Sequence, residues 1–129
     1  TQNFIDEICY ARTFCVSQDV EKLRAAGFGL GGNLNNAIVV EDNKILNDSG
    51  LRCNKEFVKH KILDCVGDFY MSGLPLLGSV HARQPGHELN NRLLKKIFEN
   101  DDNYKIIELN PYYLSISQQK NILNNINVA

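Results

Sequence analysis

One amphipathic helix constrains this chain more than any other segment. Apolar residues recur at helical spacing over 55–71, which predicts a long helix there. We expect its apolar stripe to face a core, and the stripe consists of Val58, Ile62, Cys65, Val66 and Phe69. The opposite face carries His60, Asp64 and Asp68, each one helical turn after the last.

The polar face of this helix has two interpretations. His60 and Asp64 offer a nitrogen and an oxygen one turn apart, so the helix itself would hold both on one divalent metal ion. A catalytic zinc takes three protein ligands, and this helix supplies two. Lys61, about 100° around the helix from His60, would stabilise negative charge on a substrate. The alternative is a solvated face, because H-x-x-x-D is far less specific than H-E-x-x-H.

Two further histidines have weaker signals. His87 follows Pro85-Gly86 at the start of a predicted helix. If Asp68 reaches His87, the carboxylate would orient the ring, and the imidazole would then serve as a general acid. The alternative for His87 is a capping or surface role. His81 falls in a predicted strand, where we expect it to pack or to face solvent.

The remaining predicted elements are short. They are helices at 3–11, 19–26 and 87–98, a hairpin of 37–40 and 44–46, a turn at 48–50 and a strand at 76–83. The inward residues expected of the last helix are Leu89, Leu93, Leu94, Ile97 and Phe98. The tail, 110–129, fits either a docked helix or an extended arm.

Composition excludes several classes of protein. The chain has 129 residues, 43% of them hydrophobic, which suits one globular domain. A formal net charge of -1 gives no general attraction to nucleic acid. No apolar run approaches the roughly 18 residues of a membrane span, and the first residues lack a signal-peptide pattern. The four cysteines form no C-x-x-C pair, so we expect no structural zinc site. Their even number permits disulfides, but without a secretory signal we expect reduced thiols in a cytoplasmic protein.

Several ordered motifs together resemble one enzyme family. They are Ala11-Arg12-Thr13-Phe14, Leu30 to Val40, Leu46 to Arg52, Glu56 to Asp64, Gly67-Asp68 and Gly86 to Asn91. In this order they look like the C-terminal part of UDP-3-O-acyl-N-acetylglucosamine deacetylase, the zinc amidase at the committed step of lipid A (lipopolysaccharide) biosynthesis in Gram-negative bacteria. The resemblance spans about Phe4 to Leu94.

The resemblance implies a role for each matching residue. His60 and Asp64 match two of the family's three zinc ligands. His87 matches the general acid that protonates the leaving amine, and Asp68 matches the carboxylate that pairs with it. Lys61 matches a lysine lining the substrate site. The other matching positions are Thr13, near the developing oxyanion, and Phe14, Val16, Val20 and Gly32, in the acyl-chain passage and nucleotide-sugar site.

The resemblance also implies a fold and a limit. We expect residues 1–129 to form a single α+β domain, a two-layer sandwich with helices packed on one face of a small mixed β-sheet. The family's third zinc ligand, a His, and its general-base Glu lie in an N-terminal domain that this sequence lacks. We therefore expect the chain alone to be inactive; the alternatives are a non-catalytic binding module and one half of a split enzyme.

The sequence departs from the family's pattern at two substrate positions. Val16 replaces a usual aromatic residue that contacts the substrate, and Gln84 replaces a lysine that often supports the diphosphate, although Arg83 is adjacent. Both departures concern substrate affinity rather than the class of reaction.

Overall fold

The computed structural model of the protein describes residues 2–108, which fall into two compact units, the first ending at Asp64 and the second beginning at Cys65. Helix α3 (Glu56–Tyr70) crosses the boundary between them. The single domain expected over 1–129 stays a prediction. The tail expected at 110–129 lies outside the described residues. No helix within 2–108 is long and apolar enough to cross a membrane.

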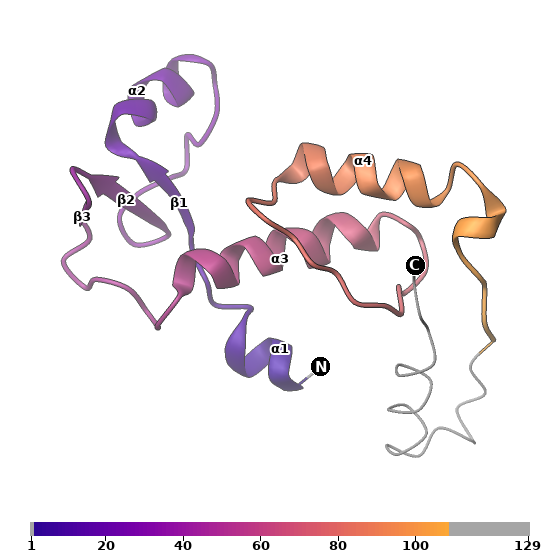
Figure 1. Ribbon diagram of the computed structural model, residues 1–129. Helices are drawn as coiled ribbons and strands as arrows, with labels where there is room; N and C mark the ends of the chain where they lie inside the picture. The colour runs from indigo at the N-terminus through magenta and orange to yellow at the C-terminus, as the bar shows by residue number, and fades with distance from the viewer. Residues whose placement is uncertain (1, 109–129) are drawn as a thin grey trace. The chain divides into compact units, whose positions relative to one another are not determined.

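The first unit is built on a small mixed sheet (Figure 1). Its elements before α3 are α1 (Gln2–Glu7), β1 (Thr13–Val16), α2 (Ser17–Ala25), β2 (Ala37–Glu41) and β3 (Lys44–Ile45). Strand β1 pairs parallel with β2, and β2 pairs antiparallel with β3. Together with the helices, this mixed sheet confirms the predicted α+β fold.

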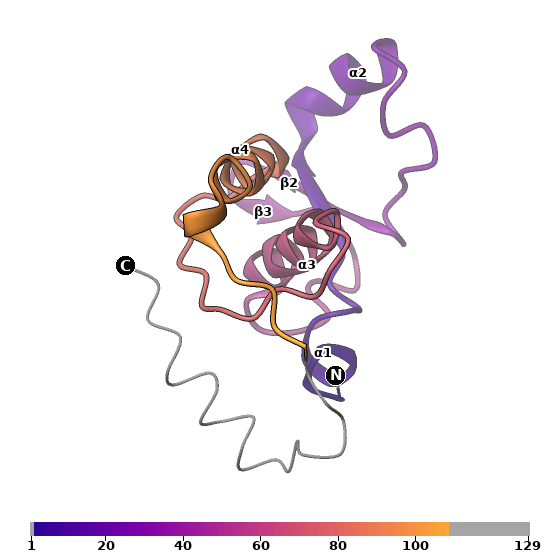
Figure 2. The same cartoon turned by 90° about the vertical axis from the view of Figure 1, so that its right-hand side faces the viewer.

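A crossover connects the two parallel strands. Parallel neighbours cannot be joined by a tight turn, so the chain leaves the sheet after β1 and returns to form β2. Helix α2 provides the first part of this connection and contacts both strands. The segment 26–36 then forms the wide loop that follows α2 in Figure 2. Strand β1 itself was not predicted from the sequence.

The predicted hairpin is confirmed, and its turn chemistry explains it. Asp42 and Asn43 take φ values of 46° and 61°, the left-handed region that a two-residue type I′ turn requires. The side chain of Asn47 then connects the hairpin to the preceding loop through hydrogen bonds. Its amide nitrogen donates to the carbonyls of Leu34 and Ala37 at 2.6 and 2.8 Å, and its oxygen accepts from the Val39 N–H at 3.0 Å. A local turn and one buried amide thus set the register of the sheet.

The second unit contains the rest of α3, helix α4 (His87–Ile97) and a short 3-10 helix η1 (Asp101–Asn103). Both long helices were predicted within one residue of their ends. The strand predicted at 76–83 is wrong, because these residues are irregular. Pro75 and Gly78 interrupt the apolar run, and no strand among the described residues pairs with it, so its backbone has no ladder to join.

The predicted core faces of both helices are largely wrong. Val58, Ile62 and Val66 of the α3 stripe are 56%, 43% and 47% exposed. On α4 only Leu94 of the expected inward residues is buried, while Leu89, Leu93 and Phe98 are exposed and Ile97 is half-buried. The predicted helix at 3–11 also ends early, at Glu7. Hydrogen bonds to Glu56, His60 and Asp64 explain why the opposite face of α3 is the better covered one.

Candidate functional site

His60 and Asp64 form a close pair on α3. The Nε2 atom of His60 lies 3.3 Å from Oδ1 of Asp64, and the two side chains are only 14% and 13% exposed. The other ring nitrogen, Nδ1, lies 3.2 Å from the carbonyl oxygen of Ala11. Because a carbonyl has no hydrogen to give, Nδ1 must carry the proton of this hydrogen bond. The solvated-face interpretation of this helix is therefore wrong for His60 and Asp64.

This pair suits part of a metal site. With Nδ1 as the donor to Ala11, the Nε2 lone pair and a carboxylate oxygen face each other, which suits the binding of a cation between them. Two ligands of a tetrahedral zinc stand about 3.4 Å apart, close to the separation observed here. Over residues 2–108, however, no group of three His, Cys, Asp or Glu side chains converges. The described residues thus fit two ligands of a zinc site.

Phe14 and Lys61 surround the same pair. The ring of Phe14, from β1, packs edge-on against Phe57 at 4.9 Å and lies 6.0 Å from the His60 ring. The ammonium of Lys61 lies 5.4 Å from the centre of the Phe14 ring and donates to Oδ2 of Asp64 at 2.9 Å. Lys61 therefore places a positive charge beside the candidate metal ligands, and its role toward a substrate stays a prediction.

A buried ion pair underlies this arrangement, and sequence reasoning missed its importance. Arg12 and Glu56 are 5% and 0% exposed. The guanidinium donates from Nε to Oε1 at 2.9 Å and from Nη2 to Oε2 at 3.1 Å. The backbone N–H groups of Arg12 and Arg52 also donate to the carboxylate, at 3.0 and 2.6 Å. We call these two side chains the Arg12–Glu56 clamp.

The clamp predicts how stability depends on pH. Hydrogen bonds from Arg12 lower the pKa of Glu56 from 4.5 to about 2. The stabilisation from the ionised carboxylate is complete above the unfolded-state pKa and is lost as the pH falls through the folded-state value. We expect the free energy of unfolding to lose about 3 kcal/mol from this group between about pH 5 and pH 2. Urea unfolding across that range tests this, with a shallower loss expected in Glu56→Gln.

Asp68 and His87 form a separate pair in the second unit. The Nδ1 atom of His87 lies 3.0 and 2.9 Å from the two oxygens of Asp68. The buried amide of Asn90 donates to Oδ2 of Asp68 at 2.7 Å, so the carboxylate is held from α4 as well. His87 is 67% exposed, whereas Asp68 is 14% exposed. The structure thus gives an accessible imidazole oriented by a covered carboxylate; its catalytic role stays a prediction.

The other predicted site residues lie around the β1–α2–β2 connection. Thr13 begins β1 and is exposed, and Val20 is half-buried on α2. Gly32 sits in a tight turn, where its N–H donates to the Gly29 carbonyl at 2.8 Å and an added Cβ would lie 3.0 Å from that same oxygen. A side chain at this position would therefore be in tight contact with the Gly29 carbonyl.

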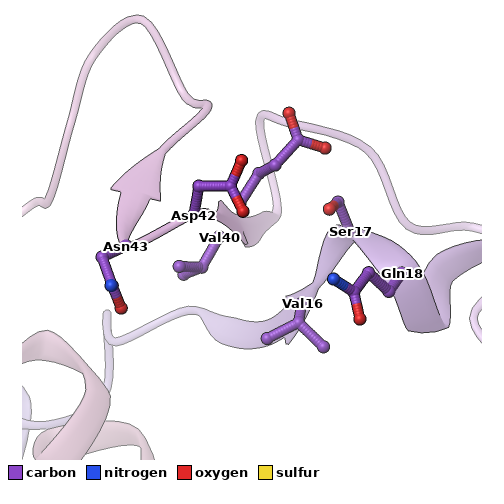
Figure 3. A pocket seen from close by; sticks show the side chains of 7 residues that line it. Val16, Ser17, Gln18, Val40, Asp42 and Asn43 are labelled. Carbon is purple, nitrogen blue, oxygen red and sulfur yellow. The ribbon is translucent and has the colours of Figure 1, made fainter.

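A small pocket opens where β1 and β2 end. It has a volume of about 210 Å³ and is lined by Val16, Ser17, Gln18, Val40, Glu41, Asp42 and Asn43. Figure 3 shows Val16 and Val40, which are register partners on neighbouring strands, together with the polar residues of the α2 start and the hairpin turn. Val16 is the one predicted substrate position in this pocket.

Comparison with known proteins identifies the family. Residues 1–99 match the family described as UDP-3-O-acyl N-acetylglycosamine deacetylase. Proteins named UDP-3-O-acyl-N-acetylglucosamine deacetylase from Psychrobacter cryohalolentis and Neisseria meningitidis are each 48% identical over 107 residues, 83% of this chain. That of Marinobacter nauticus is 49% identical over 105 residues, 81% of this chain.

The chain therefore belongs to the UDP-3-O-acyl N-acetylglycosamine deacetylase family, which confirms the resemblance read from its motifs. It spans about a third of the length of these relatives, with 33% of the Psychrobacter protein, 34% of the Marinobacter protein and 35% of the Neisseria protein covered.

Proposed function

We propose that the whole protein containing this chain hydrolyses the N-acetyl amide of UDP-3-O-acyl-N-acetylglucosamine and releases acetate. The observation that carries this proposal is the convergence of His60 Nε2 and Asp64 Oδ1 at 3.3 Å in a chain of this family. We place the reaction in lipid A biosynthesis, in the cytoplasm of a Gram-negative bacterium.

His60 and Asp64 are the residues that would hold a zinc ion. Zinc in such a site polarises the amide carbonyl and lowers the pKa of a bound water. The chain supplies two ligands, and a catalytic zinc takes three. As the resemblance to the family implies, a third histidine and a general-base glutamate would come from the rest of the protein. The 129-residue chain alone is accordingly expected to be inactive.

The remaining roles fall to residues whose chemistry suits them. His87 protonates the leaving amine from Nε2, while Asp68 accepts from Nδ1 and holds the ring. The Lys61 ammonium and the Thr13 hydroxyl stabilise the negative charge that develops on the carbonyl oxygen. Phe14, Val16, Val20 and Gly32 bind the substrate's acyl chain and nucleotide-sugar portion.

The test of the metal assignment uses the whole protein. Chelation is expected to abolish acetate release, and added Zn²⁺ is expected to restore it. His60→Ala and Asp64→Ala are each expected to weaken zinc affinity by at least about 100-fold, since loss of a ligand costs no less than loss of a group that orients one. Competition with a fluorescent zinc chelator measures the affinity.

His81→Ala is the matched control, because His81 is an exposed histidine of an irregular segment. It should leave both zinc affinity and acetate release unchanged. Full activity of the chelated protein, or unchanged zinc affinity in His60→Ala and Asp64→Ala, would contradict the assignment.

A further inference from the structure

One peptide group links the Arg12–Glu56 clamp to the His60 ring. The N–H of Arg12 donates to Oε1 of Glu56 at 3.0 Å, and the carbonyl of Ala11 accepts from Nδ1 of His60 at 3.2 Å. These two backbone atoms belong to the same peptide unit, which is planar and trans, so the N–H and C=O point in opposite directions. Residues one turn apart on α3 therefore hold this unit from both ends.

The Glu56 end of this link is fixed. Four N–H groups converge on its carboxylate, from the Arg12 backbone, the Arg12 guanidinium twice and the Arg52 backbone. The guanidinium is itself anchored, since Nη2 also donates to the Gly50 carbonyl at 2.7 Å. With no exposed surface, the carboxylate has no room to rotate, so the peptide plane is fixed as well.

The fixed peptide plane in turn constrains the His60 ring. A hydrogen bond from a peptide N–H to an ionised carboxylate polarises the peptide and makes its carbonyl a stronger acceptor. A stronger acceptor at Nδ1 keeps the proton on that nitrogen and directs Nε2 toward Asp64. Partners that fix the tautomer and orientation of a metal-ligating histidine typically change metal affinity 10- to 100-fold.

We propose that Glu56 is a positioning residue for His60, which it controls through the Ala11–Arg12 peptide. The inference rests on the proposed function of His60 as a zinc ligand and adds a residue that the metal never touches. Arg12 serves the same role indirectly, by holding the Glu56 carboxylate in place.

The first test is Glu56→Gln in the whole protein, which preserves the shape of the side chain and removes its charge. Nitrogen-15 NMR of labelled histidine in the metal-free protein is expected to show the Nδ1–H tautomer of His60 in the wild type and a mixture of tautomers in the variant. Zinc affinity is expected to fall about 10- to 100-fold.

Glu7→Gln is the matched control. Its carboxylate pairs with Lys59, the neighbour of His60, but does not contact the 11–12 peptide. It should change neither the tautomer nor the zinc affinity. A folded Glu56→Gln protein with the wild-type tautomer and wild-type zinc affinity would show that the clamp is structural only.

A second measurement needs no variant and covers the case in which Glu56→Gln fails to fold. If the peptide transmits the interaction, zinc added to the wild type strengthens the bond at Nδ1 and moves the amide proton signal of Arg12 downfield, while that of Ile8 stays in place. An unresponsive Arg12 amide in zinc-loaded protein overturns the proposal. A wild type that binds no zinc contradicts the proposed function instead, so the two failures are distinguishable.

Discussion

Glu56→Ala is expected to lower the free energy of unfolding by about 3–5 kcal/mol, because the change leaves the Arg12 guanidinium buried without its partner. The backbone N–H groups of Arg12 and Arg52 lose their acceptor at the same time. Urea unfolding followed by circular dichroism measures the loss as a lower midpoint at an unchanged slope.

Glu7→Ala calibrates this prediction on an exposed ion pair, in which Glu7 lies on α1 and its partner Lys59 lies on the same helix as Glu56. Glu7 pairs with Lys59 at 2.7 Å, but its side chain is 64% exposed, so water screens the pair and replaces it when it is broken. The expected loss is below about 1 kcal/mol. Equal losses from the two variants would mean that burial of the clamp adds nothing to its contribution.

The parts of the fold that the sequence predicts are those with local causes. The hairpin at Asp42 and Asn43 follows from turn chemistry, and α3 and α4 follow from helical periodicity. Strand β1 has only four residues, and its parallel partner lies 24 positions along the chain, so no short window contains the pair. The false strand at 76–83 shows the converse, since apolar residues without a pairing strand form no ladder.

The candidate site likewise contains residues that the local sequence predicts and residues that it does not. The spacing of His60 and Asp64 predicts their meeting, because one helix carries both. Glu56 and Arg12 are 44 positions apart, and nothing in the local pattern marks a buried ion pair there. The apolar stripe of α3 misleads for a related reason: periodicity identifies a face, whereas the polar partners Arg12, Ala11 and Lys61 decide which face is covered.

His87→Gln in the whole protein is expected to lower kcat by about 10²- to 10⁴-fold, the range for removal of a positioned general acid. Zinc affinity and KM should change little, because the bond of His87 is to Asp68, which is not one of the proposed metal ligands. Glutamine retains a group able to bond Asp68, so the variant removes proton transfer with little effect on packing. Steady-state kinetics of acetate release, with zinc saturating, make the measurement.

Two further variants separate proton transfer from loss of structure. His81→Gln changes an exposed histidine of the same unit and should leave kcat unchanged. Asn90→Ala keeps His87 but removes the amide that holds Asp68, so its kcat should fall by less than that of His87→Gln. If His87→Gln retained wild-type kcat, the proton donor would be another group, and the Asp68–His87 pair would be a structural contact. If kcat falls more in His87→Gln than in Asn90→Ala, the proton given to the leaving amine comes from the His87 ring. The Asp68 carboxylate would then affect the reaction only by orienting that ring.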